Sequence, residues 1–460
     1  MIYILLILLV MQFILAYLIT NGDLLSPWVD TCIVFIVSAT FVMFNKTKWE
    51  VEISALTVIV IFTGIAALGV GELVARRLIE PKKVVALKGI DDTKCGKEKS
   101  EIIVPAFATV AITSFMLFVL LYCIYQVNTI GTAYGGVGTQ GDILNSYRLQ
   151  SLSDEYSTSS LLKIGTLLCE VFASIYTFIL LYNAIFLRWK KSCIVLFLPV
   201  LLFLILTIYS GNRSPFIHYI VFIIVVMAIL YGMKNNWTKR PNRKILIAGI
   251  SGIAIFFLIF SLMGFFMNRV DSLEDSMQNI AGYTGGAIPA LDRFLTSFTY
   301  DIGQMGKETM QGLNRIAQSI GYSDVDAIPR HLEFINAGNM RINIYTSFRR
   351  YLHDFNYAGL YTLQFLIGFI YTSCYMAIKN GKFRNTNLAV ILYASLSYPI
   401  FMQSIDEQFL TSLLTSTMLI KVISTAVIFN ILIYMSNTAK RSGRKGISTA
   451  KKRTLYEQII

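Results

Sequence analysis

Residues 2–19 read IYILLILLVMQFILAYLI, an apolar run that contains no charged side chain. Its length matches the ~20 residues with which a helix crosses the roughly 30 Å hydrocarbon core of a bilayer. Such blocks recur along the 460 residues, of which 55% are hydrophobic and 15% are charged. The blocks lack the period-2 alternation of barrel strands. The sequence therefore predicts an all-α polytopic membrane protein and excludes both a soluble enzyme and a membrane β-barrel.

Eleven blocks are candidate spans. The last is overlong, so its first part can form a half-helix or a re-entrant piece, and twelve elements are an alternative. The candidate spans are residues 2–19, 28–44, 53–74, 104–125, 161–187, 193–209, 216–233, 245–267, 357–378, 388–404 and 409–435. They predict a membrane domain of eight spans at 1–267, a large extracytoplasmic loop at 268–356, three last spans at 357–436 and a basic cytoplasmic tail at 437–460.

Basic residues predict the orientation of these spans. Of the 40 lysines and arginines, 26 fall on one side of the eleven-span scheme, in segments 75–103, 188–192, 234–244, 379–384 and 437–460. The positive-inside rule makes that side cytoplasmic and places the N-terminus and the loop at 268–356 outside. This asymmetry accounts for the net charge of +13, so the sequence predicts no nucleic-acid partner.

The six cysteines indicate neither a disulfide framework nor a metal site. Five lie in apolar blocks, Cys95 lies in a lysine-rich loop, and the sequence contains no CxxC motif or Cys/His cluster. Small apolar core residues are their simplest interpretation. We therefore expect no metal and no cofactor.

The loop at 268–356 has an unusual set of basic residues. Seven of its eight are arginine, against 9 of the 26 on the cytoplasmic side. Membrane topology requires only positive charge, but planar, bidentate recognition of phosphate or carboxylate requires arginine. The loop also has ten acidic residues, so ion pairs within a small helical subdomain are the alternative role of these arginines.

A first constellation is the sequence from Gly211 to Pro215, which reads GNRSP. Ser214 is a good N-cap and Pro215 a good first residue of a helix. Arg213 is therefore expected beside the positive end of a helix dipole, where unpaired N–H groups and a guanidinium form an anion site. An arginine that snorkels to lipid headgroups is the alternative.

The two other constellations lie in the large loop. Residues 285–293 read GGAIPALDR, a turn into a helix with Asp292 in its first turn, for which a purely structural role is the alternative. If residues 339–356 are helical, four polar and aromatic side chains fall at successive i+4 positions, and Arg350 lies four residues from Asp354. The alternative is a solvated connector helix with a surface ion pair. The four residues of the stripe are Arg341, Tyr345, Arg349 and His353.

In this order, the three stretches resemble the Wzy-type oligosaccharide repeat unit polymerases, the O-antigen and capsule polymerases. The likeness covers about residues 210–380. Arg350 stands where the family has proline, Leu352 where it has tyrosine and Asn356 where it has glycine. The family stretch N-x-Y-T-x-F-R-P-Y-Y-x-D-F-G-x-x-G is matched by Asn343, Tyr345, Thr346, Phe348, Arg349, Tyr351, Asp354, Phe355 and Gly359.

The resemblance implies a fold similar to the membrane-embedded GT-C-like glycosyltransferases. It also implies a location in the bacterial cytoplasmic (inner) membrane, with the active site on the outer face. The substrate would be a polyprenyl-diphosphate-linked oligosaccharide, and the growing chain would pass from one such lipid to the non-reducing end of another. Neither a sugar nucleotide nor a metal is expected. A flippase and a chain-length regulator are the partners that the resemblance suggests.

Glycosyl transfer of this kind requires two catalytic roles of the protein. Negative charge gathers on the departing diphosphate, and without a metal it must be neutralised by arginines, here Arg213 and Arg349. A base must take the proton of the acceptor hydroxyl, and we expect Asp354 in this role ahead of His353. Further candidates are Arg341, Asn343, Tyr345 and Asp292 for substrate binding, and His331 and Glu333 as reserve bases.

Two other functions are alternatives. An O-antigen ligase also has a large outer loop with arginines, although a ligase-like motif with a base histidine is not clear in this sequence. A flippase or other transporter would place charged residues within its spans. Lys421 is the one charged residue that the sequence analysis identified deep in a predicted span.

The topology can be tested by reporter fusions and by accessibility labelling. Because of the charge asymmetry, reporter fusions should place segments 75–103, 234–244 and 437–460 inside and segment 268–356 outside. A cysteine introduced at Gly443 that reacts from outside would overturn the scheme.

Overall fold

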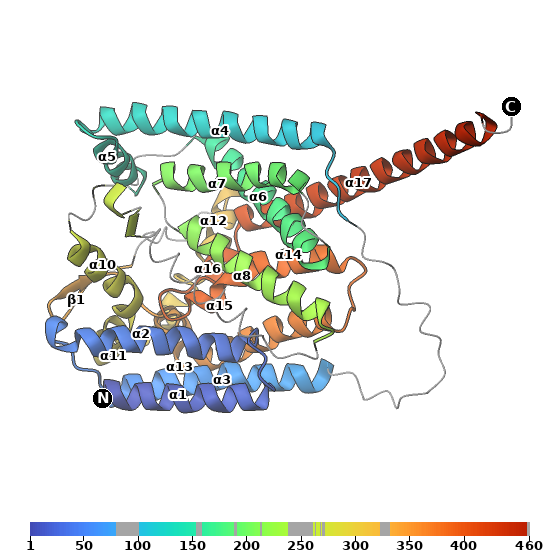
Figure 1. The fold of residues 1–460 in the computed structure, drawn as a ribbon. Helices are drawn as coiled ribbons and strands as arrows, with labels where there is room; N and C mark the ends of the chain where they lie inside the picture. Colours follow the sequence, from blue (N-terminus) through green and yellow to red (C-terminus); the bar gives the residue numbers. More distant parts are fainter. Residues whose placement is uncertain are drawn as a thin grey trace, which may run out of the picture. The chain divides into compact units, whose positions relative to one another are not determined.

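The computed structural model describes residues 1–79, 101–152, 159–187, 191–211, 214–237, 261–262, 264–266, 268, 272–322 and 332–457. The described chain is almost entirely helical (Figure 1). Eight of its helices are long and apolar enough to cross a membrane, as expected for an all-α polytopic membrane protein. The expected span at 245–267 lies mostly outside the described residues, so the number of eleven spans stays a prediction.

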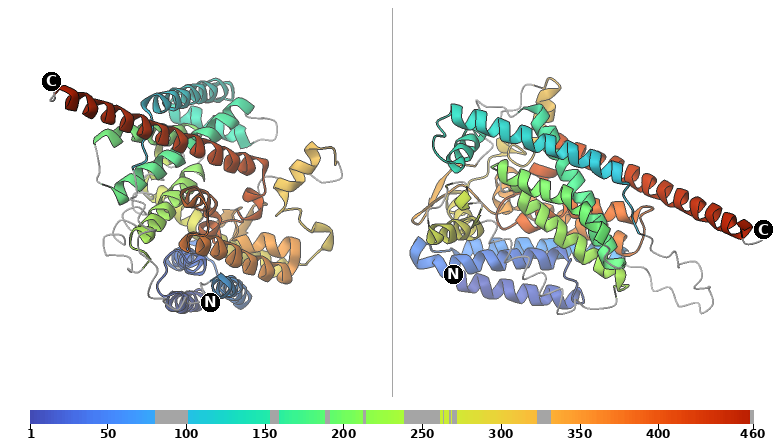
Figure 2. Two further views of the ribbon diagram at one scale, coloured as in Figure 1. Left: turned by 90° about the vertical axis from the view of Figure 1, so that its right-hand side faces the viewer. Right: turned by 45° about the horizontal axis from the view of Figure 1, so that its top comes forward.

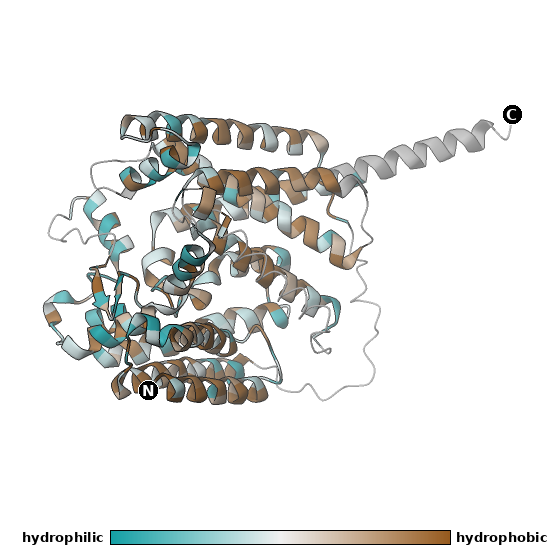
Figure 3. Cartoon of the chain, turned by 60° about the vertical axis from the view of Figure 1, so that its left-hand side comes forward, coloured by the Kyte–Doolittle hydropathy of each residue, from teal (hydrophilic) through white to brown (hydrophobic). Residues whose placement is uncertain are grey.

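The long helices follow the predicted spans closely. They are α1 (Ile2–Ile19), α2 (Pro27–Trp49), α3 (Ala55–Ile79), α4 (Ala106–Ala133), α6 (Ser160–Phe186), α8 (Ser214–Lys234), α13 (Ser347–Lys379) and the first part of α17 (Ser416–Glu457). In Figure 3 the helices beside the N-terminus are coloured as hydrophobic along most of their length. Such an all-round apolar surface is what a helix in contact with lipid requires.

Three expected spans are interrupted. The sixth consists of the 3-10 helix η2 (Lys191–Phe197) and α7 (Leu198–Tyr209), and the tenth of α14 (Thr386–Leu396) and α15 (Tyr398–Met402). A proline follows each break, at Pro199 and Pro399, where its ring fixes the backbone and its missing N–H removes a helix hydrogen bond. The overlong eleventh block divides into α16 (Leu410–Leu413) and α17, so its first part is a short separate helix as expected.

The chain divides into two compact units. Unit 2 comprises residues 86–139, 143–216 and 420–460, and holds α4, most of α5 (Gln140–Leu152), α6 and most of α17. Within it, Lys421 Nζ lies 2.5 Å from Glu170 Oε1 of α6. Both side chains lie in predicted spans, so the statement that Lys421 stands alone was wrong. The sequence analysis overlooked its partner.

Unit 1 comprises residues 1–85, 140–142 and 217–419, and its centre is the packing of α3 against α13 (Figures 1 and 2). A Cβ atom at Gly71 would lie 2.0 Å from the carbonyl oxygen of Phe365, and one at Gly368 would lie 2.0 Å from that of Leu68. The two helices therefore touch backbone to backbone. Close approach through small residues is the usual basis of helix association in membranes.

One end of this helix pair carries a network of buried charges. Glu72 accepts hydrogen bonds from the Ser26 hydroxyl and the Trp28 N–H, both at 2.8 Å, and pairs with Arg76 at 2.7 Å. Asp23 accepts from Arg76 at 3.3 Å, from Tyr375 at 2.9 Å and from Lys379 at 3.4 Å. This network joins the α1–α2 turn to the ends of α3 and α13. It lies about 45 Å of helix away from Arg349, which stands in the first turn of α13.

The other end of the helix pair is covered by the large loop. It contains α10 (Leu273–Gly285), α11 (Ala287–Ser297), the 3-10 helix η3 (Ile302–Gln304), α12 (Gln311–Ser319) and the hairpin of β1 (Ile335–Ala337) with β2 (Met340–Ile342). Helices were expected here, but the hairpin was not. Gly338, at φ 60°, begins its tight turn, and the Asn339 N–H donates to the Trp49 carbonyl at the end of α2, at 2.9 Å.

The hairpin corrects the prediction of one helix over residues 339–356. Arg341 lies on β2 and Tyr345 in the following coil, so only Arg349 and His353 share a helix. The sequence Gly338-Asn339 between two short apolar strands is a hairpin signal that could have revealed this turn. The helical spacing alone was ambiguous, because a stretch with i+4 polar residues can also hold two short strands and a loop.

The glycine contacts give a test of the fold. Gly71→Ala and Gly368→Ala should each cost about 2 kcal/mol or more, because the added methyl group would meet backbone atoms that cannot rotate away. The readout is the melting temperature of the detergent-solubilised protein. Gly282→Ala is the matched control, since a Cβ at this helical position meets nothing within 4 Å. Equal melting temperatures for all three variants would contradict the close packing of α3 and α13.

Candidate functional site

The site is built on the first turns of α13. The helix has a sharp kink at Asn356, whose backbone adopts φ 58° and ψ −170°, and whose side chain accepts the N–H of Tyr357 at 2.8 Å. This conformation is one that glycine adopts far more readily. It is also the position where the resembled family has glycine. The kink separates residues 347–355, most of which are buried, from the long span that follows.

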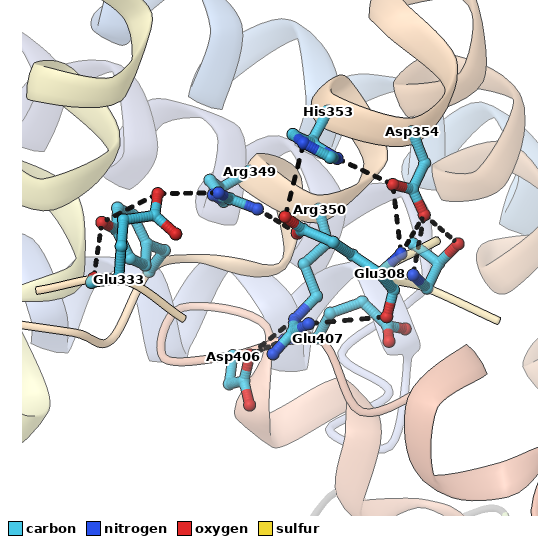
Figure 4. Close-up of polar contacts among 10 residues, drawn as sticks. Glu308, Glu333, Arg349, Arg350, His353, Asp354, Asp406 and Glu407 are labelled. Carbon is cyan, nitrogen blue, oxygen red and sulfur yellow. Dashed lines mark hydrogen bonds and ion pairs between the residues drawn. The ribbon is translucent and has the colours of Figure 1, made fainter. Parts of the chain in front are cut away.

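Arg349 is the centre of the site. It is 3% exposed, and its Nη1 pairs with Glu308 while its Nη2 donates to Glu333 at 2.8 Å (Figure 4). The guanidinium carbon lies 4.9 Å from the ring centre of Phe294 and 5.3 Å from that of Tyr345. Two carboxylates and two aromatic faces thus hold one buried cation, an arrangement that compensates its lost hydration.

Asp354 is fully buried and has its acceptor positions filled. It accepts from the N–H groups of Glu308 and Thr309 at 3.1 and 2.7 Å, and from the Thr309 hydroxyl at 2.6 Å. Its other oxygen lies 2.8 Å from His353 Nδ1. A carboxylate held in this way anchors the segment around Thr309 to α13. The predicted alternative, an ion pair between Asp354 and Arg350, was wrong.

His353 stands between two carboxylates. Its Nδ1 faces Asp354, and its Nε2 lies 3.5 Å from Glu308 Oε1 (Figure 4). The imidazole is 23% exposed, whereas Asp354 is completely covered. Nδ1 lies within hydrogen-bond distance of Asp354, whereas Nε2 is farther from Glu308, so Asp354 is the group that orients the ring. Of the two base candidates, His353 is therefore the accessible one and Asp354 the covered one, whereas the sequence placed Asp354 first.

Arg350 fixes a further loop to the same turn. Its Nε lies 3.4 Å from Asp406, and its Nη1 donates to the Glu308 carbonyl at 3.4 Å. The fully buried Glu407 accepts from the Tyr351 hydroxyl at 3.0 Å and from the N–H of Leu410, the first residue of α16, at 2.7 Å. Burial raises the pKa of Glu407 above its usual value. The loop between α15 and α16 is thereby tied to the start of α13.

Glu333 and Tyr345 form the outer side of the site. The Tyr345 hydroxyl donates to the Glu333 carbonyl at 3.0 Å and lies 3.4 Å from its carboxylate. Burial by itself raises the pKa of Glu333, but the charge and hydrogen bonds of Arg349 outweigh it, so that this pKa lies below its usual value. Burial and the charge of Glu333 together raise the pKa of Tyr345.

Asp292, Arg341 and Asn343 have partners or positions different from those of this cluster. Asp292 accepts from the Ser54 N–H at 2.7 Å and the Thr57 hydroxyl at 2.6 Å, so it joins α11 to the start of α3. Arg341 is exposed on β2 with its guanidinium 5.1 Å from the ring centre of Phe334, and Asn343 is half-buried. The structure thus assigns Asp292 a structural role. Arg213 and His331 lie outside the described residues, so their roles stay predictions.

The sequence analysis missed Glu308, which bridges Arg349 and His353. Together with His353 and Asp354, it offers ligand atoms within 4.8 Å of one another, a set that can hold a metal ion. The sequence analysis found no such set, because the three residues come from two separate segments. The atoms of Asp354 are already engaged with N–H and O–H donors, and a metal would have to displace His353 from it. We therefore keep the prediction of a metal-free reaction.

Comparison with known proteins adds no assignment to this geometry. The chain matches no protein-family model, and no curated protein or solved structure is detectably similar to it. The resemblance to repeat unit polymerases therefore depends on the motif residues alone.

Two substitutions separate the roles of the neighbouring base candidates. His353→Gln should leave the melting temperature of the protein nearly unchanged, because the ring is partly exposed. The same substitution should abolish the glycosyl transfer that the sequence resemblance implies. Asp354→Asn should lower both, since it weakens the anchor of Thr309 and the orientation of His353, with a loss of about 1–3 kcal/mol for the unsatisfied donors.

The opposite pattern would restore Asp354 as the base. Asp354 would be the base if the His353→Gln protein were active and the Asp354→Asn protein were inactive but of normal stability. Full activity in both variants would remove α13 from the proton transfer.

Proposed function

We propose that this chain is a membrane-embedded glycosyltransferase that polymerises lipid-linked oligosaccharide repeat units into a surface polysaccharide, O-antigen or capsule. The observation that carries the proposal is the meeting, at one helix end, of a buried guanidinium with a base and its orienting carboxylate. The match of this helix start to the polymerase motif supports the same conclusion. On this proposal the protein lies in the bacterial inner membrane with the site on its outer face. A flippase and a chain-length regulator would be its partners.

The residues of the site suggest how the reaction would proceed. Nε2 of His353 takes the proton of the acceptor hydroxyl, while Asp354 stabilises the imidazolium that forms. The acceptor oxygen bonds to the anomeric carbon of the donor as the bond from that carbon to the diphosphate oxygen breaks. Polyprenyl diphosphate leaves with the electron pair, and Arg349 compensates the charge that it gains. Acceptor and donor are both lipid-linked sugars, so the reaction needs no further reagent.

One observation favours a transporter as the second candidate. The predicted spans contain Glu72, paired with Arg76, and Glu170, paired with Lys421. Paired charges within spans mark ion or substrate pathways in many transporters. An assay in detergent separates the two functions, because polymerisation does not need a sealed vesicle and transport does.

The proposal is tested with the purified protein and lipid-linked repeat units in detergent. We expect a ladder of products that persists in EDTA. Arg349→Lys keeps the charge but not the bidentate fork, and should retain part of the rate. Arg349→Ala should lose roughly 10²–10³ in rate, by analogy with the loss of an oxyanion donor. It should also destabilise the protein, because it leaves Glu308 buried without its cation.

The stability effect of Arg349→Ala needs its own control. The double variant Arg349→Ala/Glu308→Gln removes the stranded charge, so it should fold better than the single variant and remain inactive. If the wild-type protein never joins single repeat units, the proposed polymerase function is refuted. Wild-type product lengths in the double variant would remove Arg349 from the reaction.

A further inference from the structure

We infer that Glu333 is a displaceable occupant of Arg349, and that the diphosphate of the substrate binds by taking its place. This inference rests on the proposed function. In the structure the charge of Arg349 is already compensated by two carboxylates, Glu308 and Glu333. A further anion on the same guanidinium would bring three negative groups onto one cation in a buried site, which is strongly unfavourable. One carboxylate must therefore leave when the ligand binds.

The two carboxylates differ in how firmly they are held. The Glu308 side chain is 8% exposed, whereas that of Glu333 is 53% exposed. The backbone of Glu308 is fixed from both sides, since its N–H donates to Asp354 and its carbonyl accepts from Arg350. Among the described residues, the Glu333 side chain is held by Arg349, the Tyr345 hydroxyl and its own backbone N–H. The half-exposed ion pair of Glu333 contributes little stability, and its carboxylate is hydrated when it moves into water, so Glu333 is the partner that exchanges.

The guanidinium has an unused donor beside the one that Glu333 occupies. Nε of Arg349 is buried and has no hydrogen-bond partner among the described residues. Nε and Nη2 point from the same edge of the planar guanidinium, the edge that matches two oxygens of a phosphate or carboxylate. Glu333 reaches only Nη2. A phosphate group in its place would accept from both donors, and would satisfy a buried polar atom that the present arrangement leaves unpaired.

The cation itself has no reason to move during this exchange. Glu308 holds Nη1, and the rings of Phe294 and Tyr345 face the guanidinium carbon. Arg349 is thus positioned before the ligand arrives, so that binding costs the ordering of few side chains. The exchange replaces one half-exposed carboxylate with one phosphate group of the ligand on the same edge of Arg349.

Binding of inorganic diphosphate to the full-length protein in phosphatidylcholine nanodiscs, measured by calorimetry, tests the exchange. Glu333→Gln should bind about tenfold more tightly than wild type, the equivalent of removing one competing charged contact. Tyr345→Phe keeps the ring over Arg349 but releases Glu333, and should shift the affinity in the same direction by a smaller factor. Glu274→Gln is the matched control, because it removes the same charge from the large loop at an exposed pair with Lys48, and should not change the affinity.

An unchanged or weaker affinity in both Glu333→Gln and Tyr345→Phe would overturn the inference. The inference would also be overturned if the gain in diphosphate affinity persisted when Glu333→Gln is combined with Arg349→Lys, because the anion would then bind elsewhere. Nanodiscs that contain phosphatidylglycerol test the other source of phosphate. If phosphatidylglycerol at its concentration in the bilayer removes the gain in diphosphate affinity, the site binds lipid headgroups and the assignment to diphosphate is wrong.

The result can be separated from the fate of the proposed function. Tighter diphosphate binding by Glu333→Gln without any polymerisation by the wild-type protein would leave the exchange standing and refute the polymerase. Polymerisation that depends on Arg349, with no effect of Glu333→Gln on diphosphate affinity, would do the reverse.

Discussion

The neutralisation of one buried cation organises the segment between α11 and α13. Arg349 is almost fully covered, and a guanidinium away from water must be paired to be tolerated. Its partners come from two distant points of the large loop, Glu308 and Glu333. Asp354 and Arg350, on the same turns of α13, then bind the backbone on either side of Glu308. The loop is thus folded around a charge that the start of α13 provides.

This arrangement depends in turn on helix packing within unit 1. Gly71 and Gly368 let α3 and α13 meet along their backbones, and the Phe348 ring lies against Gly64. Asp292 joins α11 to the start of α3, next to the end of α2, where the turn of the β1–β2 hairpin docks. The kink at Asn356 then turns residues 347–355 toward the loop. A small change in any of these contacts would move Arg349 relative to its carboxylates, because a packed interior does not deform continuously.

The same charges that stabilise the site also limit what it can bind. An arginine already paired with two carboxylates is a poor site for a third anion, but a good one for an anion that replaces a carboxylate. The exposed fraction of each partner decides which is replaced. On the inferred exchange, Glu308 stays between Arg349 and His353. Glu333, which is held by the Tyr345 hydroxyl, is the carboxylate that moves. Buried ion pairs of this kind favour a defined geometry more than they favour stability.

The sequence by itself determined the all-α polytopic membrane class and the position of most of the long helices, and it named Arg349, His353 and Asp354 as site candidates. Long apolar blocks can only be membrane helices, because lipid leaves every backbone group to be satisfied within the helix. The sequence did not predict the β1–β2 hairpin, the contacts of Asp292 with Ser54 and Thr57, or the partners that surround Asp354 and His353. Only the tertiary structure decided these points, since they depend on what lies opposite each side chain. Glu308, about forty residues before its partners, became visible as the link between Arg349 and His353 once the chain had brought them together, because local spacing carries no information about such long-range contacts.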